Sequence, residues 1–185
     1  MPKNSSDFNN TPNWYVITGG PSSGKTTVLK ELAKMGYVIY PEAARVFIDK
    51  EMAKVKTLPE IRGNEAKFQR KVLKIKIDVE KSAPMDKIVF FDRAIPDSIA
   101  YYQICGISPK EVLKVCKKNQ YKKIFLFDQL PFDQDYARIE DNKTIKKLNK
   151  LLKESYENLG YEVINIPAMP VKERVKIILS EINKD

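Results

Sequence analysis

The chain has 185 residues, 43% of them hydrophobic and 31% charged, a composition that suits one globular domain with a full core. Histidine is absent, which excludes a Ser-His-Asp triad and imidazole metal sites and leaves proton transfer to carboxylates. The formal net charge of +9 is compatible with a nucleic-acid partner, but the lysines fall mainly on polar faces of expected helices without interleaved aromatic residues. A solvated surface or steering of anionic nucleotides explains the charge more simply.

Residues 1–12 are rich in Asn, Ser and Pro and are expected to form a flexible N-terminal tail. They lack the apolar core of a signal peptide, and no apolar run in the chain is long enough to cross a bilayer. We therefore expect a soluble, cytoplasmic protein without a membrane partner.

The first predicted strand, Trp14–Thr18, leads into a loop and then into an amphipathic segment with Val28, Leu29 and Leu32 on one face. Residues 19–26 of this loop read G-x-x-x-x-G-K-T, the Walker A pattern of a P-loop, and the strand and helix on either side are the context that the pattern demands. The sequence therefore predicts a nucleotide-binding loop.

Each conspicuous residue of this loop has an expected role. Gly19 and Gly24 let the backbone bend so that successive amides point at phosphate oxygens, and the following helix adds its positive N-terminal dipole. Lys25 is expected to reach the outer phosphates, and Thr26 Oγ to bind Mg²⁺. The residues expected to bind the nucleotide, taken to be ATP, are Gly20, Pro21, Ser22, Ser23, Gly24, Lys25, Thr26 and Thr27.

Later segments alternate between strands and helices. Strands are predicted at residues 37–40, 87–91, 124–127 and 161–166, and helices near residues 42–45, 68–79, 95–105, 109–118, 145–156 and 171–182, with a break near residues 57–63. The predicted fold is therefore α/β, a P-loop NTPase with a five-stranded parallel sheet, helices on both faces and ligands at the carboxyl edge. A single nucleotide-binding domain is expected over residues 13–185.

Three side chains after predicted strands are candidates for the site. Asp92 ends an apolar run like a Walker B aspartate and is expected to hold Mg²⁺, with a helix-capping role as the alternative. Glu42 is the favoured general base, although orienting the substrate, a link to Mg²⁺ or a favourable place in a helix's first turn would also explain it. Arg93 is expected to clamp an anionic group, the alternative being a structural pair with a nearby Asp, and Arg45 is a weaker candidate of the same kind.

Two further regions are expected to border the substrate. Helical residues Asp97, Ser98, Tyr101 and Tyr102 fall after Asp92 and are candidates for its lining, although helix packing explains the tyrosines equally well. The polar segment near residues 131–142 is expected to be a closing lid, in which Arg138 folds over the phosphates and acts in catalysis. The alternative is a surface loop in which Arg138 pairs with Glu140 or Asp141.

These residues resemble the AAA-type ATPase domain family that includes the ribosylnicotinamide kinase domain of the bacterial NAD regulator, and more broadly the nucleoside and nucleotide kinases. The resemblance spans most of residues 14–182 and is carried by the P-loop, by Pro41–Arg45, and by Phe91–Arg93 with Pro96–Ser98. It implies that the acidic residue after the second strand and the Asp-Arg pair after the third serve the phosphate acceptor and Mg²⁺.

The leading functional hypothesis is an ATP-dependent phosphotransferase, a small-molecule kinase that moves the γ-phosphoryl of Mg-ATP to a nucleoside- or nucleotide-like acceptor. The alternative is a nucleotide-gated regulatory module that acts through a partner. Guanine specificity is weakly supported, because Asn142–Ile145 lacks the aspartate of N-K-x-D and Asp92–Ile95 lacks the glycine of D-x-x-G. A polynucleotide-end kinase is the third possibility and rests only on the net charge.

Overall fold

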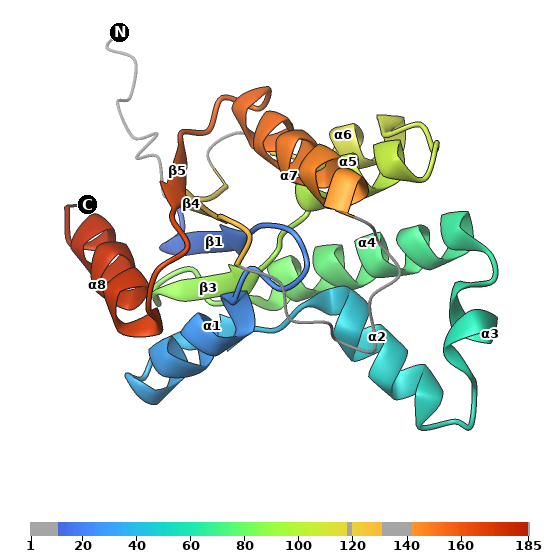
Figure 1. Ribbon diagram of the computed structural model, residues 1–185, viewed down its shortest axis with the longest axis horizontal. Coiled ribbons are helices and arrows are strands. Elements are labelled where there is room, and N and C mark those ends of the chain that lie inside the picture. Colours follow the sequence, from blue (N-terminus) through green and yellow to red (C-terminus); the bar gives the residue numbers. More distant parts are fainter. Residues whose placement is uncertain (1–10, 118–119, 131–141, 185) are drawn as a thin grey trace, which may run out of the picture.

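The computed structural model describes residues 11–117, 120–130 and 142–184. Five parallel strands form one sheet in the order β2-β3-β1-β4-β5, and helices cover both of its faces, which confirms the predicted α/β fold (Figure 1). The strands are β1 (Trp14–Thr18), β2 (Val38–Tyr40), β3 (Val89–Asp92), β4 (Lys123–Phe127) and β5 (Val163–Ile166). The helices are α1 (Lys25–Lys34), α2 (Ala43–Met52), α3 (Leu58–Arg62), α4 (Glu65–Ser82), α5 (Asp97–Ile104), α6 (Lys110–Val115), α7 (Asn142–Glu157) and α8 (Val171–Ile182).

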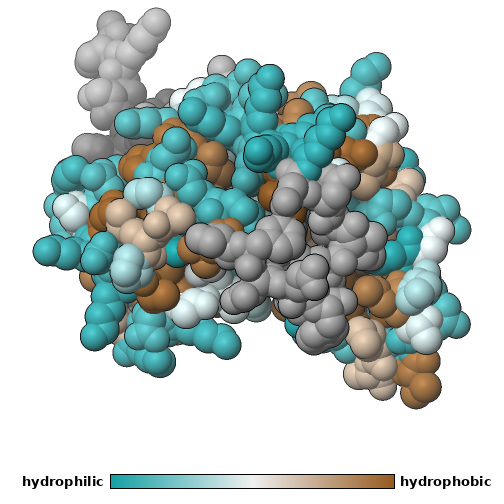
Figure 2. Space-filling model, viewed as in Figure 1, coloured by the Kyte–Doolittle hydropathy of each residue, from teal (hydrophilic) through white to brown (hydrophobic). Residues whose placement is uncertain are grey.

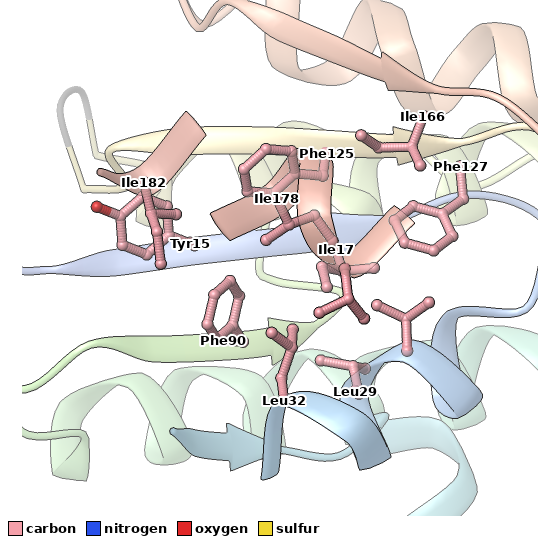
Figure 3. Packing of buried hydrophobic residues seen from close by; sticks show 12 residues of the cluster. Tyr15, Ile17, Leu29, Leu32, Phe90, Phe125, Phe127, Ile166, Ile178 and Ile182 are labelled. Carbon is pink, nitrogen blue, oxygen red and sulfur yellow. The ribbon is translucent and has the colours of Figure 1, made fainter. Parts of the chain in front are cut away.

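One face of the sheet is covered by α1 and α8. Ile17, Phe90 and Phe125 project from the three central strands to this face and pack with Leu32 of α1 and Ile178 of α8, and all five are completely buried (Figure 3). Burying an apolar side chain of this size contributes roughly 1.5–3 kcal/mol to stability. This packing fixes the carboxyl end of β1 and the start of α1, between which the P-loop lies.

The opposite face packs against α4, α5 and α7. Side chains alternate along a strand, so Val16, Phe91 and Ile124 point away from α1 and meet Val79 of α4 and Tyr156 of α7. The central strands are therefore buried on both sides, whereas the edge strands β2 and β5 are mostly half-buried. This difference explains why the central strands are the more continuously apolar in sequence.

Helices α2, α3 and the first turns of α4 group together on the side of the P-loop (Figure 1). The sequence predicted a break near residues 57–63, but the structure forms the short helix α3 there, because Thr57 and Glu60 make a capping box. Figure 2 shows hydrophobic residues at the corner between α2 and α3, where Met52 and Val55 are exposed. These helices form one wall of the cleft described below.

Two other findings concern membrane-spanning helices and the cysteines. No helix formed by the described residues is long and apolar enough to span a bilayer. Cys105 and Cys116 are half-buried and form no disulfide with each other.

Candidate nucleotide site and adjoining cleft

The P-loop connects the buried end of β1 to the first turn of α1. Gly19 has a φ of +139°, and a Cβ atom there would lie 2.7 Å from the carbonyl oxygen of Phe127, so that only glycine fits. Gly24 is the N-cap of α1 with a φ of +82°. Thr26 and Thr27 are exposed in the first turn of the helix. The backbone of the loop thus turns through positive-φ conformations at both glycines, the kind of backbone in which successive amides can converge on an anion.

Lys25 is held inside this loop. Its Nζ donates hydrogen bonds to the carbonyl oxygens of Gly19 (3.0 Å) and Gly20 (2.8 Å) and to Ser23 Oγ (3.2 Å), and the residue is 6% exposed. Burial and, to a smaller extent, the nearby Arg93 guanidinium lower the pKa of the Lys25 ammonium to about 8. Phosphate oxygens next to this group would favour its charged form.

Glu42 and Arg93, which are 51 positions apart, form an ion pair between Oε1 and Nη1. The sequence placed Glu42 at the start of a helix, and it is the N-cap of α2, but its side chain makes no capping hydrogen bond and turns to Arg93 instead. Burial disfavours the charged form of Glu42, yet Arg93 and Lys25 outweigh this and lower its pKa. Glu42 is therefore an ionised carboxylate at neutral pH.

Arg93 contacts both the carboxylate and the P-loop. Its Nη2 donates to the Gly19 carbonyl oxygen (3.1 Å), and its guanidinium lies 5.2 Å from the centre of the Tyr101 ring. The residue has a φ of +64°, which is uncommon for a side chain of this size and is typical of strained functional positions. Arg93 pairs with Glu42 and not with a neighbouring aspartate, which was the structural alternative drawn from the sequence.

Asp92 is the last residue of β3 and is 4% exposed. Its Oδ1 atom accepts no hydrogen bond from the described residues. Burial raises the pKa of the carboxyl to about 6. The N-cap of the next helix is Pro96, so Asp92 does not cap α5. A buried carboxylate with an unsatisfied oxygen at the end of the sheet is a suitable ligand for a cation.

A cleft of about 390 Å³ opens beside the P-loop. The P-loop and the first turn of α1 form one side of it, and the rest comes from α2 with its N-cap Glu42, from α4 and α5, from Arg93 directly after β3 and from Arg62 at the end of α3. It is lined by Pro21, Ser22, Gly24, Lys25, Thr26, Thr27, Glu42, Ala44, Arg45, Ile48, Arg62, Phe68, Gln69, Val72, Lys76, Arg93 and Tyr101. Nucleotide-loop residues and the Glu42–Arg93 pair thus face one space, whose volume is in the range of small-molecule sites.

The other residues that were predicted to line the site lie in different places. Tyr101 faces the cleft, but Tyr102 packs in another cluster and its hydroxyl donates to Glu111 Oε1 (2.5 Å). Asp97 is completely buried behind the site, where it accepts hydrogen bonds from Ala94 N (2.8 Å) and from the hydroxyls of Thr18 and Tyr156. The segment near residues 131–142 and its Arg138 lie outside the described residues, apart from the first residue of α7.

The structure places several residues at the site for which the sequence predicted no role. Gln69 and Lys76 line the cleft and are 4% and 5% exposed. Gln69 directly follows Phe68, and Lys76 is four residues after Val72, so both are polar residues beside the apolar stripe of α4. Their position in the helix was the signal that could have indicated a role at the site. Arg174 of α8 is also buried, and its Nη1 donates to the Ser23 carbonyl oxygen of the P-loop (2.7 Å). No sequence pattern indicated that contact.

A family model described as an AAA domain matches residues 14–174. The chain therefore belongs to this family, which confirms the resemblance seen in the P-loop and in the motifs that follow the second and third strands. No curated protein matches the sequence.

Solved structures of several kinases share the fold. Shikimate kinase from Aquifex aeolicus is 18% identical with a TM-score of 0.56, and the match covers 92% of this chain and 96% of that one. Deoxyadenosine kinase from M. mycoides with bound dATP is 16% identical with a TM-score of 0.62, covering 92% and 99%. The NadR protein in complex with NR is 16% identical with a TM-score of 0.66, covering 94% of this chain and 50% of that one. At these identities the likeness shows the fold, which is that of the P-loop kinases.

Proposed function

We propose that this protein is a P-loop kinase that transfers the γ-phosphoryl group of Mg-ATP to an oxygen of a small nucleoside- or nucleotide-like acceptor. The observation that carries the proposal is the cleft in which Lys25, Glu42 and Arg93 face the same space. A protein that only bound or hydrolysed a nucleotide would not need a cleft that continues from the P-loop to side chains of α2, α4 and α5.

In the proposed reaction, an acceptor oxygen forms a new bond to the γ-phosphorus while the bond from that phosphorus to the β–γ bridging oxygen breaks and ADP leaves. Lys25 leaves its carbonyl partners and binds the phosphates, and Arg93 stabilises the charge that spreads over the transferring group. Both cations line the cleft, and Lys25 exchanges its loop partners for phosphate oxygens when the nucleotide binds, before the moment of transfer.

Glu42 is proposed to accept a hydrogen bond from an acceptor hydroxyl and to take its proton as the new bond forms. Because Arg93 and Lys25 lower its pKa, Glu42 is in the ionised form needed for this role at neutral pH, but it is a weak base. Orientation of the hydroxyl is therefore its larger contribution, which agrees with the small part that proton abstraction plays in phosphoryl transfer.

Thr26 and Asp92 are the residues that would hold Mg²⁺. Asp92 Oδ1 has no hydrogen-bond partner among the described residues, and Thr26 is exposed in the first turn of α1. Mg²⁺ in such sites takes one or two protein oxygens and completes its shell with phosphates and waters, so these two residues fit it. The ion would neutralise charge on the β- and γ-phosphate oxygens.

A transfer assay tests the proposal. The protein is incubated with γ-labelled ATP, Mg²⁺ and a panel of nucleosides and nucleotides, and we expect label on at least one acceptor. Glu42→Gln should lower kcat by about 10²-fold and change ATP affinity little, whereas Glu162→Gln, at an exposed glutamate, should change neither. Slow release of free phosphate without transfer to any acceptor would contradict the kinase and favour the nucleotide-gated module.

A further inference from the structure

Lys76 is a buried cation that the proposed reaction does not use. It lies on α4, lines the cleft and is 5% exposed. Its Nζ donates a hydrogen bond to Ser98 Oγ (3.0 Å), and among the described residues no carboxylate oxygen lies within 4.0 Å of it. An ammonium group has three protons to donate, so this one has donors to spare.

The carboxylates around Lys76 are each engaged elsewhere. Glu42 pairs with Arg93, Asp97 accepts from Ala94 and two hydroxyls, and Glu80 Oε1 accepts from Ile95 N (3.1 Å) and Tyr121 OH (2.8 Å). Burial lowers the pKa of Lys76, and the longer-range attraction of Asp97 offsets this only in part. A buried cation without an ion-pair partner is costly, and such groups are normally paired when they persist.

The charge of the cleft agrees with an anionic ligand at Lys76. Five of its lining residues are basic and one, Glu42, is acidic. Lys25 is needed for the nucleotide, and Arg45 and Arg62 have ion pairs of their own with Asp49 (3.6 Å) and Glu65 (3.0 Å). Lys76 thus differs from Arg45, Arg62 and Arg93, which line the same cleft, because it is deeply buried and has no carboxylate partner among the described residues.

The arrangement along α4 also defines the shape of the ligand. Phe68, Val72 and Lys76 are spaced at i, i+4 and i+8 and line the same cleft, so that about 12 Å separates the first from the last along the helix axis. At the Phe68 end, Ile48 of α2 packs in the same cluster and the Arg62 guanidinium lies 5.3 Å from the centre of the Phe68 ring, whereas the Lys76 end meets Ser98 near the start of α5. A molecule with a ring at one end and an acidic group at the other matches both ends.

From this geometry we infer that Lys76 binds an acidic group, a phosphate or a carboxylate, on the acceptor whose ring lies against Phe68 and Val72. The inference rests on the proposed kinase function, because it assigns the acceptor side of that same cleft. It favours acidic acceptors, such as nucleoside monophosphates or cyclic hydroxy acids, over uncharged nucleosides.

Equilibrium calorimetry with the four ribonucleoside 5′-monophosphates, the matching nucleosides and shikimate tests the inference. At least one acidic probe should bind about tenfold tighter than the uncharged probes, since a charge-assisted hydrogen bond supplies that preference. A preference for a monophosphate would identify phosphate as the group that binds, and a preference for shikimate would identify carboxylate. Equal binding of charged and uncharged probes, or binding of none, would overturn the inference without any need for a variant.

Two variants show whether Lys76 causes the preference for acidic probes. Lys76→Met is the test variant, and Lys74→Met, at an exposed lysine on the same helix, is the control. Lys76→Met should weaken the acidic probe about tenfold and change uncharged probes less than about twofold, and Lys74→Met should change neither. Equal weakening of charged and uncharged probes would mean that Lys76 is only structural and would overturn the inference.

Binding and transfer can fail separately. If acidic probes bind in this pattern but no phosphoryl group is transferred, the kinase proposal fails and the Lys76 site stands. If an uncharged nucleoside is phosphorylated and Lys76→Met changes nothing, the kinase proposal stands and the Lys76 site fails.

Discussion

Replacing Asp92 by asparagine should make the protein more stable and less active at the same time. The Asp92 carboxyl is 4% exposed, its Oδ1 accepts no hydrogen bond from the described residues, and burial raises its pKa from 3.8 to about 6. The folded protein therefore resists ionising this group. Asparagine keeps the shape of the side chain but carries no charge.

The raised pKa sets both the sign and the size of the effect. Between about pH 4 and pH 6 the folded state binds more protons at Asp92 than the unfolded state does, so the free energy of unfolding falls as pH rises. Each pKa unit corresponds to about 1.4 kcal/mol, so ionised Asp92 costs about 3 kcal/mol above pH 6. Asp92→Asn avoids this cost, and its advantage should vanish towards pH 4.

Urea denaturation at pH 4, 6 and 8 measures this difference. Asp92→Asn should unfold at a higher urea concentration than the wild type at pH 8 and at a similar one at pH 4, whereas Asp78→Asn, at an exposed position of α4, should match the wild type at each pH. The same variant should need much more Mg²⁺ for phosphoryl transfer. A variant less stable than the wild type at pH 8, or a gain independent of pH, would refute the reasoning.

Three other variants test other parts of the site. Lys25→Ala should lower kcat by at least about 10²-fold with little change in thermal unfolding; an active variant would remove Lys25 from the phosphate site. Glu80→Gln should raise the free energy of unfolding by up to about 3 kcal/mol at pH 8, because burial raises the Glu80 pKa to about 7 and glutamine still accepts the hydrogen bonds from Ile95 N and Tyr121 OH. A variant no more stable than the wild type would contradict this. Arg174→Met should weaken ATP binding about tenfold in calorimetry, because the hydrogen bond to Ser23 is lost; unchanged affinity would mean that α8 does not position the loop.

The fold was largely predictable because its signals are local. A continuous apolar run such as 124–127 predicts a buried strand whatever the rest of the chain does, and the structure has β4 there. The capping box of Thr57 and Glu60 is also local and could have predicted α3, but the glycine and proline around it were interpreted as a break.

The candidate site was predictable only where a residue's position along the chain determines its place in space. The P-loop and the end of β3 belong to this class, because parallel strands bring their carboxyl ends to one edge. Asp97 is the contrary case, since it follows β3 closely but its side chain turns into the core, where Thr18 and Tyr156 satisfy it. Sequence distance from the strand does not reveal that direction.

By itself, the sequence determined that the chain forms a parallel α/β sheet with a nucleotide-binding loop, because glycine conformations, apolar periodicity and strand ends act over a few residues. Only the tertiary structure decided that Glu42 pairs with Arg93, that Lys76 faces the cleft without a carboxylate partner among the described residues, and that Arg174 reaches the P-loop. The hydrogen bonds concerned join residues far apart in the chain, from 22 positions for Lys76 and Ser98 to 151 for Arg174 and Ser23. They depend on how whole helices pack on the sheet, and local patterns carry no record of that packing.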